Sequence, residues 1–234
     1  MNKIPTVLTI AGSDSGGGAG IQADLKTFAC QQTHGMSAIT CVTAQNTVGV
    51  QRVDALAPEA VAAQIASVAS DIGVAAAKTG MLLNREIMAA VAAAVKQWQI
   101  TPLVVDPVMV SRAGAQLIDD AAIATLKTQL IPLATVLTPN RYEAELLTGL
   151  KLQDLATMRA AAQQIQNELG AEAVLVKGGS MQADCQAIDV WYDGRVFEVL
   201  QTEVVDTPHT HGTGCSLAAA IAANLAKGLA PLEA

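Results

Sequence analysis

A short glycine-containing loop leads into a helical pattern near the end of the chain, and together they could bind an anion. The loop consists of four consecutive residues, Gly212, Thr213, Gly214 and Cys215. Leu217, Ile221 and Leu225 follow at helical spacing among alanines, which predicts a helix that begins at the loop. The N–H groups at a helix start can bind an anion, and the pKa of a cysteine there is expected to fall. The alternative is an ordinary glycine turn before a buried helix.

A second glycine-rich segment, residues 12–20, follows the first strand-like run of the chain. Its spacing matches neither the dinucleotide-binding fingerprint nor the P-loop, but its glycines allow the backbone to approach a ligand closely. Asp24 comes next, between Ile21 and Phe28 at the edge of an apolar helical face, which is an unusual place for an acid. A flexible turn and a structural charge are the alternatives for these two features.

Further polar residues follow the predicted strands. Gln45 offers a donor and an acceptor side by side, which complements the edge of an aminopyrimidine ring. Met81 could flank a flat heterocycle, although a methionine is more often part of the core. Lys177 precedes two glycines and provides a cation for phosphate. Each of these residues alone is a weak signal.

Carboxylates at the end of one strand and the start of one helix indicate a cation site. Asp106 directly follows a buried strand-like run, a common place for a carboxylate associated with magnesium. Asn140 and Glu143 lie one helical turn apart and could share a metal hydration shell. Helix capping is the alternative role for Asn140.

The elements that must position these residues alternate between strands and helices. Strand-like runs cover residues 6–11, 36–43, 75–78, 103–105, 135–137 and 173–176, with a hairpin at 188–192 and 196–200. Helical patterns cover residues 20–32, 60–70 and 121–130 and also begin after Asn84, Asn140 and Asp154. This order predicts an α/β fold with a mainly parallel central sheet and helices on both faces, and ligands at the carboxyl ends of the strands. No linker or repeat divides residues 1–234, so we expect one domain.

Composition limits the class of protein. Of 234 residues, 51% are hydrophobic and 15% charged, which argues against disorder. The net charge of -7 makes nucleic acid an unexpected partner, and no apolar run is long enough for a membrane span. The four cysteines lack CxxC spacing, so neither a metal cluster nor a disulfide framework is expected. These features favour a reducing, cytoplasmic setting.

Taken together, the motifs resemble those of the hydroxymethylpyrimidine and hydroxymethylpyrimidine-phosphate kinases of thiamine biosynthesis, which belong to the ribokinase-like superfamily. The matching segments occur in the family's order and span the chain: residues 9–27, 43–47, 78–82, 106–109, 138–140 and 211–215. The resemblance implies phosphorylation of the pyrimidine's hydroxymethyl group, and then of the monophosphate, with ATP and Mg²⁺. It also implies a homodimer.

The resemblance assigns a role to each candidate residue. It implies a pyrimidine pocket lined by Gly12, Ala19, Asp24, Gln45, Met81 and Val108. The nucleotide phosphates would be served by Asp106, Asn140 and Lys177, magnesium by Asp106 and Glu143, and the anion hole by Gly212, Thr213, Gly214 and Cys215.

Three positions depart from related kinases. Most ribokinase-like sugar kinases have aspartate at the end of this loop. This chain has Cys215 there, as the pyrimidine kinases and some pyridoxal kinases have cysteine. His209 lies where a lysine-asparagine-threonine segment is expected and could alter contacts near the nucleotide. The given sequence ends at Ala234, where relatives usually continue through one more helix, whose absence would affect stability and the adenine side of the site. A pyridoxal kinase and a non-catalytic pyrimidine-binding protein remain the alternative functions.

Overall fold

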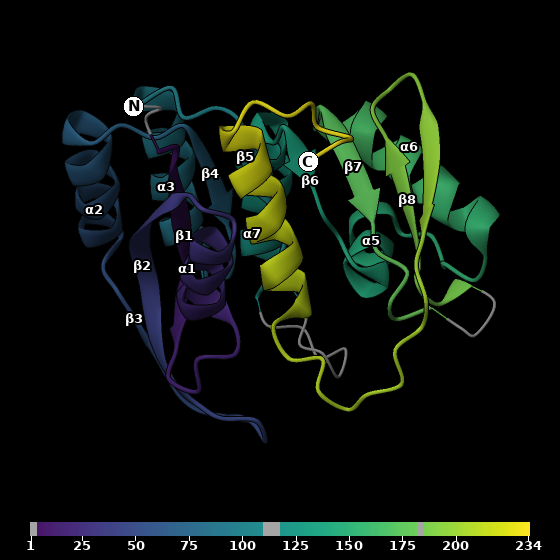
Figure 1. The fold of residues 1–234 in the computed structure, drawn as a ribbon, viewed down its shortest axis with the longest axis horizontal. Coiled ribbons are helices and arrows are strands. Elements are labelled where there is room, and N and C mark those ends of the chain that lie inside the picture. Colours follow the sequence, from purple (N-terminus) through teal and green to yellow (C-terminus); the bar gives the residue numbers. More distant parts are fainter. Residues whose placement is uncertain (1–3, 110–117, 182–184) are drawn as a thin grey trace.

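A single mixed sheet runs through the protein (Figure 1). The computed structural model describes residues 4–109, 118–181 and 185–234. Within these ranges the strand order is β3-β2-β1-β4-β5-β6-β7-β8-β9. The strands are β1 (Thr6–Asp14), β2 (His34–Gln45), β3 (Val50–Ala55), β4 (Ala76–Thr79), β5 (Leu103–Val105), β6 (Val136–Leu137), β7 (Ala173–Val176), β8 (Ile188–Tyr192) and β9 (Phe197–Gln201).

The mainly parallel sheet predicted from the sequence is confirmed. The six strands β1, β2 and β4 to β7 pair in parallel, whereas β3, β8 and β9 add antiparallel pairs at the two edges. The sequence analysis missed β3. All six of its residues are exposed, so it lacks the alternation of apolar and polar residues that marks a half-buried strand.

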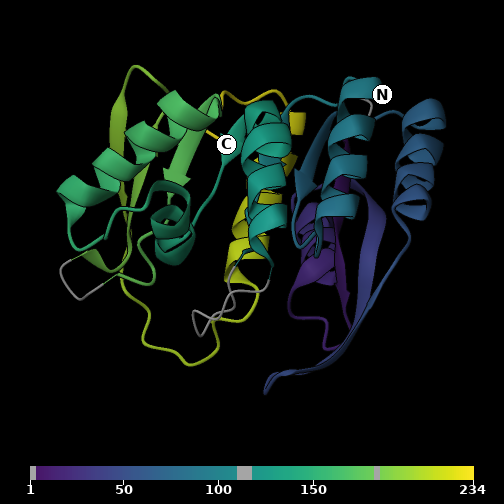
Figure 2. The ribbon, with the colours of Figure 1, turned by 180° about the vertical axis from the view of Figure 1, so that it is seen from behind.

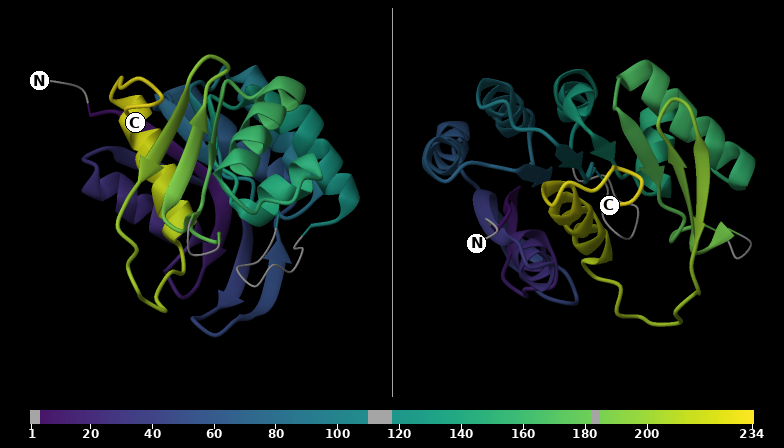
Figure 3. Two further views of the ribbon diagram at one scale, coloured as in Figure 1. Left: turned by 90° about the vertical axis from the view of Figure 1, so that its right-hand side faces the viewer. Right: turned by 45° about the horizontal axis from the view of Figure 1, so that its top comes forward.

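Helices cover both faces of the sheet (Figures 2 and 3). One face carries α1 (Gly20–Cys30) and α7 (Thr213–Ala226); the other carries α2 (Pro58–Asp71), α3 (Arg85–Gln97), α4 (Asp120–Thr125), α5 (Arg141–Thr148) and α6 (Leu155–Leu169). Strand β5 shows how the sheet serves both cores. Leu103 and Val105 belong to the larger apolar cluster and Val104 to the smaller one, as the two-residue period of a strand requires.

Two helices begin or end in ways that the sequence explains. Asn84 caps α3 as predicted, accepting a hydrogen bond from the Ile87 N–H at 2.9 Å. The helical pattern at 121–130 is only partly α-helical, because α4 continues as a π-helical turn (Leu126–Leu130) and then a short 3₁₀ helix. Pro132 in that 3₁₀ helix cannot donate to a longer α-helix.

Among the described residues, no helix is long and apolar enough to span a membrane.

The topology defines where ligands should bind. The chain passes from β1 to β2 through α1 on one face and reaches β4, on the other side of β1, through α2 on the opposite face. This reversal beside β1 is a topological switch point, and such folds bind ligands outside the carboxyl ends of the strands there. The start of α7 and the glycine-rich loop (residues 15–19) lie at this same edge, the lower one in Figure 1.

Candidate active site

The anion loop (Gly212–Cys215) begins α7, as the sequence predicts. Gly212 is the N-cap residue and has a φ of 83°, a left-handed conformation that favours glycine. A Cβ atom at Gly212 would also collide with the carbonyl oxygen of Gly18 in the glycine-rich loop. The helix start and the glycine-rich loop are therefore packed directly against each other.

Cys215 lies in the first turn of α7, and its predicted pKa shift is wrong in direction. Burial raises the pKa of the thiol, although Lys78 and the Gly20 N–H favour the thiolate. The negative charges of Asp106 and Asp24 act in the same direction as burial. Desolvation therefore outweighs the effect of the helix start, and the free site holds Cys215 as a neutral thiol at neutral pH.

A buried ion pair lies beneath the site. Lys78 on β4 and Asp24 on α1 both have 0% side-chain exposure, and the Lys78 Nζ lies 3.0 and 2.9 Å from the two carboxylate oxygens. Thr9 on β1 donates a third hydrogen bond to Asp24, at 2.6 Å. Burial opposes the charge on Lys78, but the carboxylates of Asp24 and Asp106 outweigh it and raise the pKa of the amine, which stays protonated.

The structure shows Asp24 as the buried partner of Lys78. The resemblance assigns Asp24 to the pyrimidine pocket, whereas the structure places its carboxylate fully inside the protein, in contact with Lys78 and Thr9. The sequence analysis gave Lys78 no role. A lysine inside an otherwise apolar strand-like run was the available signal, because lysine is almost never fully buried without a partner.

A second ion pair, partly buried, stands at the ends of β5 and β7. The Lys177 Nζ donates to the Asp106 carboxylate at 3.1 Å, and Thr138 donates to the same oxygen at 3.3 Å. A Cβ atom on Gly214 would lie 3.3 Å from the Lys177 Nζ. The structure thus brings the predicted cation and carboxylate directly against the anion loop. Asp189 on β8, which the sequence analysis missed, accepts from the Gly178 N–H at 2.8 Å and holds the loop after Lys177.

Asn140 and Glu143 form a capping box at the start of α5. The Asn140 side chain accepts from the Glu143 N–H at 3.1 Å, and Glu143 accepts from the Asn140 N–H at 2.9 Å. The capping alternative for Asn140 is therefore confirmed. Burial, together with the charge of Asp106, raises the pKa of Glu143 to about 8, against the opposing effect of Lys177. Burial and the Asp106 charge thus favour the protonated form of Glu143 in the free protein.

These residues offer a metal the Asp106 carboxylate and, once it has lost its proton, the Glu143 carboxylate. Among the described residues, no group of three His, Cys, Asp or Glu side chains could hold a metal ion alone. In the described part of the chain, Lys177 and Thr138 both donate to one Asp106 oxygen, Oδ1. Such a site fits magnesium, which takes one or two carboxylates and completes its shell with waters and substrate phosphates.

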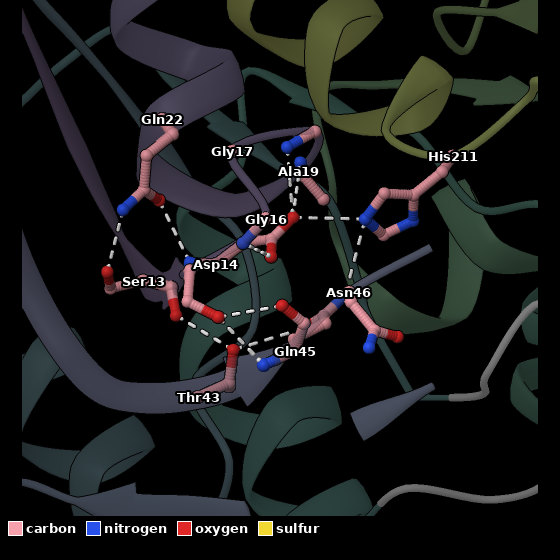
Figure 4. A network of polar contacts seen from close by, with 12 residues as sticks. Ser13, Asp14, Gly16, Gly17, Ala19, Gln22, Thr43, Gln45, Asn46 and His211 are labelled. Carbon is pink, nitrogen blue, oxygen red and sulfur yellow. Dashed lines mark hydrogen bonds and ion pairs between the residues drawn. The ribbon is translucent and has the colours of Figure 1, made fainter. Parts of the chain in front are cut away.

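The glycine-rich loop folds around Asp14, the last residue of β1 (Figure 4). The N–H groups of Gly16, Gly18 and Ala19 donate to its carboxylate at 2.8, 3.1 and 2.8 Å, and His211 Nε2 lies 3.0 Å from Oδ2. Burial disfavours the Asp14 carboxylate, but these partners outweigh it and hold its pKa below the ordinary value. The sequence analysis missed Asp14. Three backbone donors of the loop are therefore directed at a side chain of the protein.

The residues assigned to the pyrimidine pocket lie around the edge of the sheet formed by the carboxyl ends of the strands. A Cβ atom on Gly12 would lie 2.9 Å from the Met81 Cε and 2.8 Å from the Cys41 sulfur, so Gly12 and Met81 are in contact. The Gln45 amide lies 3.1 Å from Thr43 Oγ1 and 3.3 Å from His211 Nε2. Val108 follows the end of β5 and is half-buried.

A site of this kind is built for phosphoryl transfer. That reaction needs little covalent chemistry from the protein, and it depends on positioning and on positive groups around the phosphates. The helix start and Lys177 supply those groups at one edge of the sheet. The fold and the site together define a kinase.

Comparison with known proteins agrees with this class. The family model for phosphomethylpyrimidine kinase matches residues 14–234. The chain is 62% identical over 231 residues to the hydroxymethylpyrimidine/phosphomethylpyrimidine kinase of Synechococcus elongatus, covering 99% of this chain and 87% of that protein.

Two solved structures are also similar. The phosphomethylpyrimidine kinase of Clostridium difficile has a TM-score of 0.88 at 42% identity, covering 99% of this chain and 94% of the other. The pyridoxal kinase of Bacillus subtilis, in complex with ADP, has a TM-score of 0.91 at 43% identity, covering 99% of this chain and 87% of the other. The chain belongs to the phosphomethylpyrimidine kinase family, and it is an ATP-dependent kinase with the ribokinase-like fold.

The buried pair of Lys78 and Asp24 yields a stability prediction. Replacing Lys78 by Met leaves a buried carboxylate without its cation and should lower the free energy of unfolding by about 3–5 kcal/mol. The double variant Lys78→Met/Asp24→Asn should recover a large part of that loss, because it removes the unpaired charge. Urea unfolding of both variants measures the difference, and Lys96→Met, at an exposed position on α3, is the control. A single variant as stable as the wild type would contradict the role of the pair.

Proposed function

We propose that this chain transfers the γ-phosphoryl group of ATP to the hydroxymethyl group of 4-amino-5-hydroxymethyl-2-methylpyrimidine, and then phosphorylates the monophosphate to the pyrophosphate. The observation that carries the proposal is the anion loop of α7, packed against the Lys177 amine at the end of β7. Family membership over residues 14–234 and the name of the Synechococcus relative support the choice of substrate.

The pyrimidine would bind beside the ends of β1, β2 and β4. We assign its recognition to six residues: Gly12, Ala19, Asp24, Gln45, Met81 and Val108. Gln45 supports this assignment because its amide lies at the surface of the protein, beside His211. There the amide can contact the ring of a bound ligand. Asp24 would act from below, through Lys78, since its carboxylate is fully buried.

The nucleotide phosphates would bind between the anion loop and Lys177. Asp106, Asn140 and Lys177 are the residues assigned to them, and Asp106 and Glu143 are those assigned to Mg²⁺. Bound magnesium would neutralise phosphate charge and orient the transferring group. Because the pKa of Glu143 is raised to about 8, its carboxyl group must lose a proton before it binds a cation.

The two phosphorylation steps make different demands on Cys215. The alcohol must lose a proton when it attacks, whereas a phosphate monoester has a second pKa of about 6 and is already largely ionised at neutral pH. A thiolate could accept the alcohol's proton, but a neutral thiol could not. Cys215 therefore acts as a base only in the fraction of molecules in which it is ionised.

Pyridoxal is a second candidate substrate. The similarity to the Bacillus subtilis pyridoxal kinase covers 99% of this chain at 43% identity, and pyridoxal also carries a hydroxymethyl group. The two candidates differ in the ring edge that Gln45 would meet. Turnover of both alcohols by the same preparation separates them.

The substrate prediction is tested by ADP release. ADP should form from ATP only when the pyrimidine alcohol and a divalent cation are both present. Gln45→Ala should raise the KM for the pyrimidine by about tenfold, the value of one neutral hydrogen bond, and change the KM for ATP less. Gln163→Ala, at an exposed position on α6, is the matched control. Equal ADP release with and without the pyrimidine would rule the function out.

The pKa direction of Cys215 gives a prediction about pH. If the thiolate is the base, the single-turnover rate of the alcohol step should rise from pH 6 towards the raised pKa, above the ordinary thiol value of 9.0, and the monophosphate step should lack this rise. Cys215→Ala should abolish the rise and slow the alcohol step by about 10²–10⁴-fold. The monophosphate step should slow less. Equal losses in both steps would assign Cys215 to the shape of the anion loop and not to proton transfer.

We also propose that two copies of the chain associate through the hairpin of β2 and β3. Strand β3 is an edge strand with every residue exposed, and four exposed valines lie on this hairpin: Val42, Val48, Val50 and Val53. Exposed apolar edge strands favour pairing with another chain. Sedimentation velocity should detect a dimer that Val53→Lys weakens and Val196→Lys, an exposed valine beside the opposite edge, leaves intact. A monomeric wild type would overturn this proposal.

A further inference from the structure

We propose that His211 is a positioning residue that joins the anion loop at the start of α7 to the glycine-rich loop after β1. The inference rests on the proposed pyrimidine kinase function, because the two loops would hold the two reactants. His211 directly precedes Gly212 and points from the last turn before α7 towards Asp14, at the end of β1 (Figure 4).

The contact between the two loops is both polar and steric. His211 Nε2 lies 3.0 Å from Asp14 Oδ2, and the Asp14 side chain is only 3% exposed. The imidazole ring also lies on Gly18, where a Cβ atom would come within 2.7 Å of the His211 Cδ2. Any side chain at Gly18 would therefore displace the ring. The next residue, Gly212, packs on the Gly18 carbonyl group.

Hydrogen bonds to Asp14 connect His211 to the backbone of the glycine-rich loop. Its Oδ2 accepts from His211 and also from the N–H groups of Gly18 and Ala19, while Oδ1 accepts from Gly16. One carboxylate therefore fixes the conformation of the loop and the position of His211 at the same time. Movement of the anion loop would therefore change the position of Ala19, which we assign to the pyrimidine pocket.

The same imidazole also meets the residue proposed to read the pyrimidine edge. The Gln45 amide nitrogen lies 3.3 Å from His211 Nε2, and Thr43 Oγ1 lies 3.1 Å from Gln45 Oε1 and donates to the Ser13 carbonyl at 2.9 Å. Because the His211 Nε2–H donates to Asp14, it offers the Gln45 amide nitrogen no acceptor, so a pyrimidine that accepts from that nitrogen would satisfy it and leave the His211–Asp14 hydrogen bond in place. Substrate contacts at Gln45 would thus lie directly beside the hydrogen bond that joins the two loops.

Three variants separate a hydrogen-bonding role from simple space filling. His211→Leu keeps volume and removes the donor, His211→Gln places an N–H near the position of Nε2, and Asp14→Asn alters the acceptor. The control is His34→Leu at the start of β2, where the residue is exposed and lies outside both loops. The His211 side chain is 37% exposed, so both of its variants should fold.

The first measurement is hydrogen–deuterium exchange without substrate. In His211→Leu, amides in residues 12–20 and in residues 210–216 should exchange faster together, whereas His211→Gln and His34→Leu should match the wild type. Faster exchange near residue 211 alone, or equal exchange in all proteins, would overturn the proposal. Because no substrate is present, this result stands even if the pyrimidine proves not to be the substrate.

The second measurement is the single-turnover rate of pyrimidine phosphorylation. His211→Leu should lower it about tenfold, His211→Gln should restore most of the rate, and in the Asp14→Asn background His211→Leu should add little further loss. Equal losses for Leu and Gln, or additive losses with Asp14→Asn, would show that His211 does not act through Asp14. If Asp14→Asn fails to fold, the comparison of Leu with Gln decides the question alone.

Discussion

The ion pair between Lys78 and Asp24 is the constraint on which the site depends. Removing two charges from water is costly, so each must keep its partner at close range inside the protein. This requirement fixes α1 against β4, next to the switch point of the sheet. The Lys78 charge also acts on Cys215 and Asp106, and Asp106 in turn pairs with Lys177. Positive and negative groups thus alternate beneath the anion loop.

The two glycine-containing loops differ in what their backbone N–H groups contact. The N–H groups of Gly16, Gly18 and Ala19 are directed at Asp14, so they stabilise the protein's own loop. The start of α7 lies against Lys177. The helix N–H groups and the Lys177 amine could both donate hydrogen bonds to a phosphate. The glycine-rich loop would therefore shape the pyrimidine side of the site, and the helix start would hold the phosphates.

Local patterns predicted the elements and the edge of the sheet that carries the site, because apolar periodicity and chain order are properties of short segments. The site contacts could not be read in the same way. Asp24 and Lys78 are 54 residues apart in the chain, and Asp14 and His211 are 197 apart, so no local pattern connects them. The pKa of Cys215 was predicted wrongly for a related reason: the helix start is visible in the sequence, but the burial that outweighs it appears only when α7 packs on the sheet. The exposed strand β3 lacked a pattern altogether.

The central claim is that phosphates bind at the start of α7 and not at the glycine-rich loop. The most direct measurement is a crystal structure of the chain with a non-hydrolysable ATP analogue and the pyrimidine alcohol. We expect the γ-phosphate to accept hydrogen bonds from the backbone of Gly212–Cys215, with the Lys177 amine beside it and the pyrimidine ring edge at Gln45. A γ-phosphate held by the N–H groups of Gly16 and Gly18, with Asp14 displaced from them, would contradict the account.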